Sequence, residues 1–543
     1  MIERIVENWL NNASERSFQL PFCYILQNQG HKILHLTRHR PMEFGKDVIT
    51  IDSGGNYHAY QLKQGFINQR IWTEIFPQLT QLCFKNLAHP HVPKDSIYTP
   101  YLVTNGGIDE EVYRGIEDFN ESLKAAGRPI LKILKYDDLY TDFLTLGAKL
   151  WPTELADYKK LIEFTIFDGN EPFPTEKLIS LLESQLELSS ADSSVIKNLP
   201  SAKRQITSSA LLTAYCTSSY LEKENHVAII EAWVIYLSQV NALLLKLDLD
   251  IKELEEVFKI GMQIIFQSLQ NLTDELEQRD DLFEGNIIFD APFYGYRATR
   301  VVGLVAVLFL WIKLNDSDRE QLDRVIIIIN KFIKECRIIS EAHIPYFLSI
   351  YWAMRKYDST QKPVGFLKMI IDTIIDASKK GYGLANPYYR EKDLISLHLQ
   401  NILKSEIDHS ITIGIEPLDD SFEFTSFYLY GLVQIFTRLN YKQEMKFLWP
   451  SITRFNFKHF QIEEHWHFFK WRNKDVGKEK SYLPAFTQSW QELKEIASNY
   501  DERKIPTPLI NDPIFGLLFL LYFPHRVTPD IIKFLDNELR LKI

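Results

Sequence analysis

The sequence predicts two kinds of structure in one chain: an α/β domain over about residues 1–150, then a large all-α region. Before Trp151, apolar and β-branched runs bounded by turn residues alternate with helical patterns. After Trp151, apolar residues recur almost everywhere with a period near 3.6. A length of 543 residues also exceeds what one hydrophobic core usually holds. The predicted class is therefore α/β plus all-α and multidomain, with a mixed central sheet flanked by helices in the first domain.

Composition limits the choice of compartment and partner. The net charge of −10 lies almost entirely after residue 150, so the first domain can approach a phosphate backbone more easily than the rest. The four cysteines are far apart in the sequence, which favours reduced thiols and a cytoplasmic protein. The apolar run Val301–Ile312 is too short to cross a bilayer, and no membrane partner is expected.

The first domain begins with helical patterns. Apolar residues of Ile2–Leu10 share one helical face, and a second helix is predicted from Ser14 to a C-cap at Gly30. A strand, His31–Leu36, then leads into a polar loop, and a hairpin follows between Gly45 and Gly65. The elements predicted after it are helix 71–86, which Pro77 should kink or split, strand 101–104, helix 109–126, strand 130–134 and a helix from residue 137.

Three polar side chains interrupt the hairpin. Val48–Ile51 and Tyr57–Lys63 read as its strands, joined by turn residues that accept positive φ. Asp47 stands at the entry of the first strand, and Gln61 and Lys63 share one face of the second. A carboxylate and an amide oxygen can hold a divalent metal ion, with an ammonium group beside it.

The order helix, strand, Gly-Lys-Asp, hairpin, Gln-Leu-Lys resembles the Mrr-like restriction endonucleases of the PD-(D/E)xK nuclease superfamily, in their D…QxK form. The resemblance covers about the first 150 residues. It implies a restriction-endonuclease-like fold with Asp47, Gln61, Lys63 and a helical glutamate as catalytic residues. Glu15 is the preferred glutamate, with Glu7 and Glu3 as alternatives. Mg²⁺ or Mn²⁺ would be held by Asp47, Gln61, Glu15 and the carbonyl group of Leu62.

The resemblance also implies a function. It indicates a Mg²⁺-dependent DNA endonuclease that serves as the effector of a prokaryotic defence system against phage or other foreign DNA. Cutting both strands suggests a homodimer or larger oligomer, and a separately encoded ATPase is a possible partner. The alternatives are an inactive nuclease fold that acts as a scaffold and a nuclease that acts on RNA. Candidate phosphate contacts beside the site are Arg38, Arg40, Lys46, Gln64 and Arg70, with a solvated loop surface as the equal alternative.

The remainder is predicted as a helical sensor or oligomerisation region, 151–470, and a C-terminal helical subdomain, 471–543. His459, Glu463 and His467 are spaced to share one face of a continuous helix and could bind a metal ion, although packing histidines are favoured there. Arg454–His459 also fits the loose R-x4-H pattern of HEPN-type ribonucleases, which occurs often by chance.

Overall fold

The computed structural model describes residues 6–7, 10–11, 13–36, 46–87, 92–93, 96–147, 155–164, 166–188, 199–249, 255–282, 287–315, 319–358, 360, 362–380, 383–389, 391, 393–394, 424–470, 479–482 and 489–539. Contacts divide the chain into two compact units. The first comprises 1–236 with 254–257, and the second comprises 237–253 with 258–543. The predicted boundaries after residues 150 and 470 both fall inside these units.

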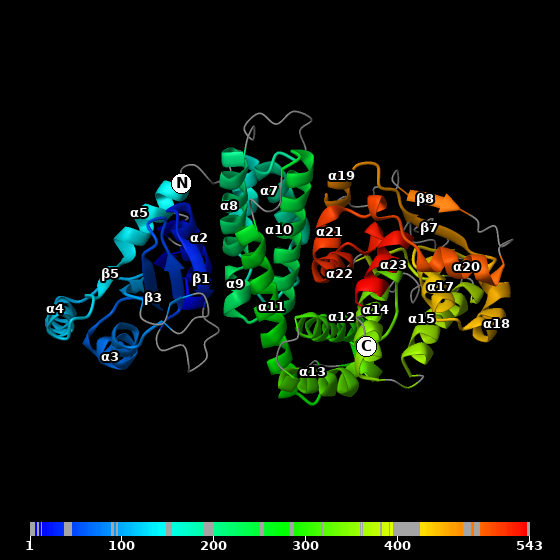
Figure 1. Cartoon of the computed structure of the whole chain (residues 1–543), viewed down its shortest axis with the longest axis horizontal. Coiled ribbons are helices and arrows are strands. Elements are labelled where there is room, and N and C mark those ends of the chain that lie inside the picture. The colour runs from blue at the N-terminus through cyan, green and yellow to red at the C-terminus, as the bar shows by residue number, and fades with distance from the viewer. Residues whose placement is uncertain are drawn as a thin grey trace, which may run out of the picture. The chain divides into compact units, whose positions relative to one another are not determined.

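A five-stranded mixed sheet forms the centre of the N-terminal part (Figure 1). Its strands follow the chain in the order β1-β2-β3-β4-β5. β1, β2 and β3 pair antiparallel, whereas β3, β4 and β5 run parallel. The strands are β1 (Lys32–Leu36), β2 (Val48–Ile51), β3 (Tyr57–Lys63), β4 (Tyr98–Thr104) and β5 (Lys132–Leu134). The three parallel strands therefore end at one edge of the sheet.

Helices cover both faces of this sheet. α2 (Glu15–Asn28) packs on one face, where the rings of Phe22 and Tyr60 meet edge to face at 5.3 Å. α3 (Gln69–Phe84) and α4 (Glu110–Ala125) bury their apolar stripes against the other face. α3 continues through Pro77 as one helix, contrary to the expected kink or split. The predicted coarse class, a mixed α/β domain followed by a largely helical region, is confirmed.

The helices that follow the sheet in the first unit extend its core. α2 packs against α8 as well as against the sheet, and so it is buried on two sides. The helices are α5 (Tyr136–Gly147), α6 (Leu155–Glu163), α7 (Thr175–Gln185), α8 (Leu199–Cys216), α9 (Ser218–Glu222) and α10 (His226–Lys246). Within the described residues, α10 is the one helix long and apolar enough to cross a membrane. Its most apolar window is 89% buried inside the structure, as in a core helix.

The second unit is largely helical. Its central pair, α12 and α14, approaches closely at Gly303, where a Cβ atom would lie 2.7 Å from Tyr346. The helices from α11 on are α11 (Glu255–Glu277), α12 (Ile287–Leu314), α13 (Arg319–Phe332), α14 (Ile344–Tyr357), α15 (Lys362–Lys379), α17 (Leu429–Arg438), α18 (Lys442–Ile452), α19 (His465–Phe469), α20 (Trp490–Ser498), α21 (Thr507–Asn511), α22 (Pro513–Tyr522) and α23 (Pro529–Glu538). The periodicity of the sequence also predicts a helix over 395–404, and these residues lie outside the described part of the chain.

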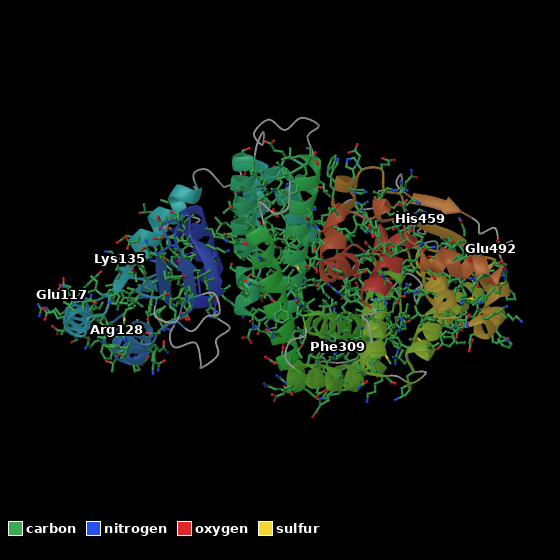
Figure 2. All side chains as sticks on the ribbon, viewed as in Figure 1. Glu117, Arg128, Lys135, Phe309, His459 and Glu492 are labelled. Carbon is green, nitrogen blue, oxygen red and sulfur yellow. The ribbon has the colours of Figure 1, made fainter. Side chains whose placement is uncertain are left out.

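A small sheet interrupts this helical unit, and the sequence did not predict it. It consists of β6 (Thr425–Ser426), β7 (Asn456–Phe460) and β8 (Glu479–Tyr482). His459 lies on β7 (Figure 2), where its Nδ1 atom is 2.9 Å from the carbonyl oxygen of Phe460, whereas His467 lies on the separate helix α19. The continuous helical face proposed for His459, Glu463 and His467 is therefore wrong. The described residues contain no group of three or more His, Cys, Asp or Glu side chains that could hold a metal ion.

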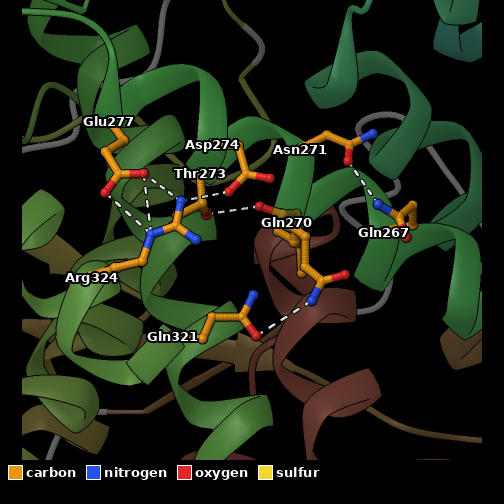
Figure 3. A network of polar contacts seen from close by, with 9 residues as sticks. Gln267, Gln270, Asn271, Thr273, Asp274, Glu277, Gln321 and Arg324 are labelled. Carbon is orange, nitrogen blue, oxygen red and sulfur yellow. Dashed lines mark hydrogen bonds and ion pairs between the residues drawn. The ribbon is translucent and has the colours of Figure 1, made fainter. Parts of the chain in front are cut away.

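Surface polar contacts join α11 to α13 (Figure 3). Arg324 donates to both carboxylate oxygens of Glu277 at 3.1 Å from Nε and to Asp274 at 2.8 Å from Nη2. One helical turn before Asp274, the side-chain N–H of Gln270 donates to the side-chain oxygen of Gln321 at 3.4 Å. Because the charged groups are exposed, these contacts contribute little stability and mainly fix how the two helices align.

Two ionisable groups are fully buried at the short 3₁₀-helix Glu341–His343. Burial raises the pKa of Glu341 to about 7, although the backbone N–H of Phe427 donates to its carboxylate at 2.7 Å. Burial lowers the pKa of His343 to about 3. The Nδ1 atom of His343 accepts from the backbone N–H groups of Ile339 and Ser340, both at 3.2 Å, which fixes a neutral imidazole.

We expect His343→Gln to change the pH dependence of stability. In the wild type the unfolded His343 takes up a proton below pH about 6.5, whereas the folded one stays neutral down to about pH 3. The unfolding free energy that His343 contributes is therefore lost as the pH falls between these values. Glu341 acts in the opposite direction, because its raised pKa favours folding at low pH. The unfolding free energy of the variant relative to wild type should therefore rise by up to about 1.4 kcal/mol per pH unit of acidification. Urea unfolding between pH 7 and 4 measures this difference, and parallel curves would contradict it.

Candidate active site

The hairpin brings Asp47 and Gln61 into contact. Asp52 closes the turn by accepting from the backbone N–H groups of Gly54 and Asn56, both at 2.9 Å, which sets the register of β2 against β3. The N–H of Asp47 donates to Tyr60 at 2.8 Å, so the residue continues the ladder just before β2. Its Oδ2 atom accepts from Gln61 Nε2 at 2.7 Å.

The backbone of Leu62 converges on the same carboxylate. Its N–H donates to Asp47 Oδ2 at 2.7 Å. Along a strand, the N–H and C=O of one residue point to the same side, so the carbonyl group of Leu62 leaves β3 toward Asp47. Asp47 is 8% exposed and Gln61 3% exposed, so these contacts lie in a largely dry environment.

Lys63 lies two residues after Gln61, on the same face of β3. Its Nζ atom is 3.4 Å from Oε2 of Glu15, the first residue of α2, with the side chains 17% and 29% exposed respectively. The structure therefore brings together Glu15 and Lys63 as one pair and Asp47 and Gln61 as the other. Glu15, the preferred helical glutamate, thus contacts the predicted lysine.

The donor atoms at this edge suit a hard divalent cation. Gln61 Oε1 is buried and has no hydrogen-bond partner among the described residues, although a buried amide oxygen normally finds one. A carboxylate from Asp47, this amide oxygen and the Leu62 carbonyl group are oxygen ligands of the type that Mg²⁺ and Mn²⁺ prefer. The residues present therefore fit the ion that the sequence pattern implies.

Asn105 also contributes to the site, although it was not predicted as a site residue. It follows β4 and is 3% exposed. Its Nδ2 atom donates to the carbonyl oxygens of Leu10 and Ala13 at 2.7 and 2.8 Å, and its Oδ1 atom accepts from Gly65 at 2.7 Å. Its position after β4 is the sequence feature that could have identified it, because β4 runs parallel to β3 and ends at the same edge of the sheet.

The candidate phosphate contacts differ in position. Arg70 is 83% exposed at its side chain and lies 3.6 Å from Glu74, and Gln64 is exposed directly after Lys63. Lys46 points inward: it is 3% exposed, and its amine donates to the carbonyl oxygen of Gln81 at 3.5 Å. Burial lowers the pKa of Lys46 to about 8, which argues against a role on the DNA surface. Arg38 and Arg40 lie outside the described residues.

Comparison with protein-family models, with curated proteins and with solved structures gives no match for this chain.

Proposed function

We propose that the N-terminal domain is a metal-dependent endonuclease that hydrolyses DNA phosphodiester bonds. The observation that carries the proposal is the buried Asp47–Gln61 contact at 2.7 Å, with an unpartnered amide oxygen, next to the Lys63–Glu15 pair. Buried polar groups collected at the carboxyl ends of parallel strands are typical of a ligand-binding or reactive site. The mixed five-stranded sheet flanked by helices also supports the proposal, because the resemblance implies a sheet of this kind.

Each residue has a distinct role in the proposed reaction. Asp47, Gln61 and the Leu62 carbonyl group would hold Mg²⁺, which supplies Lewis acidity and an activated water molecule when bound. Lys63 would place its ammonium group beside the bound phosphate, where it stabilises negative charge. Glu15 restrains the flexible lysine side chain through their 3.4 Å contact and so fixes its position before substrate binds.

The wider role is part of the same proposal. A nuclease that lacks a recognisable base-reading module needs control from elsewhere, and the helical remainder of the chain would supply it by sensing a trigger, assembling into at least a dimer or binding a partner such as an ATPase. Defence against phage or other foreign DNA is the proposed context, by analogy with nuclease fusions of this type.

Cleavage assays on plasmid DNA, linear DNA and RNA, with and without Mg²⁺, test the proposal. We expect Mg²⁺-dependent DNA cleavage, and Lys63→Ala should lower its rate by about 10²–10⁴-fold because the charge beside the phosphate is lost. Lys124→Ala is the matched control, since Lys124 is an exposed lysine on α4 and its removal should leave the rate unchanged.

The other outcomes separate the alternatives. Cleavage of RNA alone would replace the DNA substrate in the proposal with RNA. DNA binding without cleavage at any Mg²⁺ or Mn²⁺ concentration would favour an inactive nuclease fold that acts as a scaffold. Cleavage that survives Lys63→Ala would show that the activity comes from a different site or from a contaminant.

A further inference from the structure

Asn105 ties its own segment, directly after β4, to two segments that are far from it in the sequence. Its two amide hydrogens go to Leu10 and Ala13, 95 and 92 residues away, and its oxygen binds Gly65, 40 residues away. The side chain is therefore fully used, and it is 3% exposed. A buried amide with three short hydrogen bonds to backbone groups holds those groups with little freedom.

The two segments that Asn105 joins carry the two members of the Lys63–Glu15 pair. Ala13 lies two residues before Glu15, and Gly65 lies two residues after Lys63. The carbonyl oxygen of Gly65 is also held by the hydroxyl group of Thr104 at 2.7 Å, and the backbone N–H of Ile67 donates to Gly107 at 2.9 Å. The residues after β3 are thus held by hydrogen bonds to the residues after β4. Asn105 adds hydrogen bonds from the same place to the segment that precedes α2.

We infer that Asn105 is a positioning residue that sets the Glu15–Lys63 geometry by tying the start of α2 to the exit of β3. This inference rests on the proposed function, because the pair gains its importance from the reaction. The contact between Glu15 and Lys63 is long at 3.4 Å and partly exposed, so it is too weak to hold the two segments together by itself. The buried amide of Asn105 supplies that restraint.

Asn105→Asp is expected to break the hydrogen bonds to the segment before α2 and to keep the hydrogen bond to Gly65. The aspartate keeps an oxygen for the N–H of Gly65, but it places a carboxylate against the carbonyl oxygens of Leu10 and Ala13. Repulsion then releases the segment before α2 while the β3 exit stays bonded. Because small displacements of reacting groups are costly, we expect kcat to fall about 100-fold, with little change in KM for DNA.

Asn120→Asp is the matched control. Asn120 on α4 also ties a distant backbone, donating to the carbonyl oxygen of Leu131 at 3.1 Å and accepting from its N–H at 2.8 Å. Loss of these hydrogen bonds should lower the stability of the protein without changing kcat.

Asn105→Asp combined with Glu15→Gln should be no slower than Glu15→Gln alone, because both changes act on the Glu15–Lys63 pair. Additive losses would contradict the inference.

Two measurements do not depend on cleavage. Acylation of lysines, followed by mass spectrometry, should label Lys63 faster in Asn105→Asp and in Glu15→Gln than in the wild type, with Lys124 unchanged in all three. Hydrogen exchange of peptides spanning residues 10–16 should accelerate in Asn105→Asp and not in Asn120→Asp. If the variants show these changes but the wild type has no nuclease activity, the proposed function fails and the positioning role stands. Unchanged labelling and unchanged exchange would overturn the positioning role, whatever the activity.

Discussion

Asp47→Asn is expected to lower DNA cleavage by about 10³-fold or more while the protein stays folded. Asp47 accepts from Gln61 and from the backbone N–H of Leu62, so it organises the oxygen donors of the site. A metal ion contributes several kcal/mol to the stabilisation of charge in phosphoryl transfer, and each 1.36 kcal/mol corresponds to a factor of ten in rate. Measuring kcat across a Mg²⁺ titration tests this, since a weakened site should also need more metal.

The matched control for this variant is Asp109→Asn. Asp109 begins α4 at the same edge of the sheet, and its side chain makes no capping hydrogen bond. This change should leave cleavage intact. Asp47→Asn should also cost about 1–3 kcal/mol of stability, because an amide at this position cannot accept from both buried donors as well as the carboxylate does. An Asp47→Asn protein that cleaves DNA at the wild-type rate would remove Asp47 from the mechanism.

The hairpin could be predicted from sequence because its signals are local. The β-branched run Val48–Ile51 and the Gly-Asn turn specify two paired strands, and the two-residue period puts Gln61 and Lys63 on one face. The contact between Gln61 and Asp47 follows from this pairing. The alternation of strands and helices before Trp151 is equally local, so the observed elements lie close to the predicted ones.

The features that the sequence did not predict depend on contacts between distant segments. Asn105 looks like a turn residue in sequence, and its role depends on bonds to Leu10 and Ala13. Lys46 looks like a surface cation beside Asp47, but its long side chain reaches α3 and is buried there. The strand β7 has only five residues and pairs with two segments that are distant from it in the sequence, β6 and β8. No local pattern in the sequence encodes such pairing.

Several helices of the second unit were not predicted, and α14 and α22 were missed for a different reason. In α14 every residue from Ile344 to Met354 is buried, and in α22 the same holds from Ile514 to Tyr522. A helix buried on all sides has no polar face, so its sequence lacks the 3.6-residue alternation that identifies amphipathic helices. These helices form the core that the surrounding amphipathic helices cover.

A buried charge cluster in this core leads to the second large prediction. Asp536 on α23 is 0% exposed at its side chain and forms an ion pair with Arg438 on α17, itself 8% exposed. The indole N–H of Trp352 on α14 donates to Asp536 at 2.8 Å, and Arg355 lies 3.5 Å from the same oxygen. One carboxylate thus connects three helices of the second unit, and its removal takes away the buried anion that pairs with Arg438.

Asp536→Ala is therefore expected to destabilise the second unit by about 3–5 kcal/mol. Hydrogen exchange of peptides from α14, α17 and α23 measures this locally, without assuming that the whole chain unfolds in one step. Asp530→Ala is the control on the same helix: Asp530 lies 3.0 Å from Lys533 and is 19% exposed, so its loss should cost about 1 kcal/mol or less. Asp536→Leu with Arg438→Met should recover most of the lost stability, because a buried ion pair replaced by packed apolar groups is often neutral. If the double variant is as unstable as Asp536→Ala, the cost arises from lost packing rather than from the loss of the ion pair.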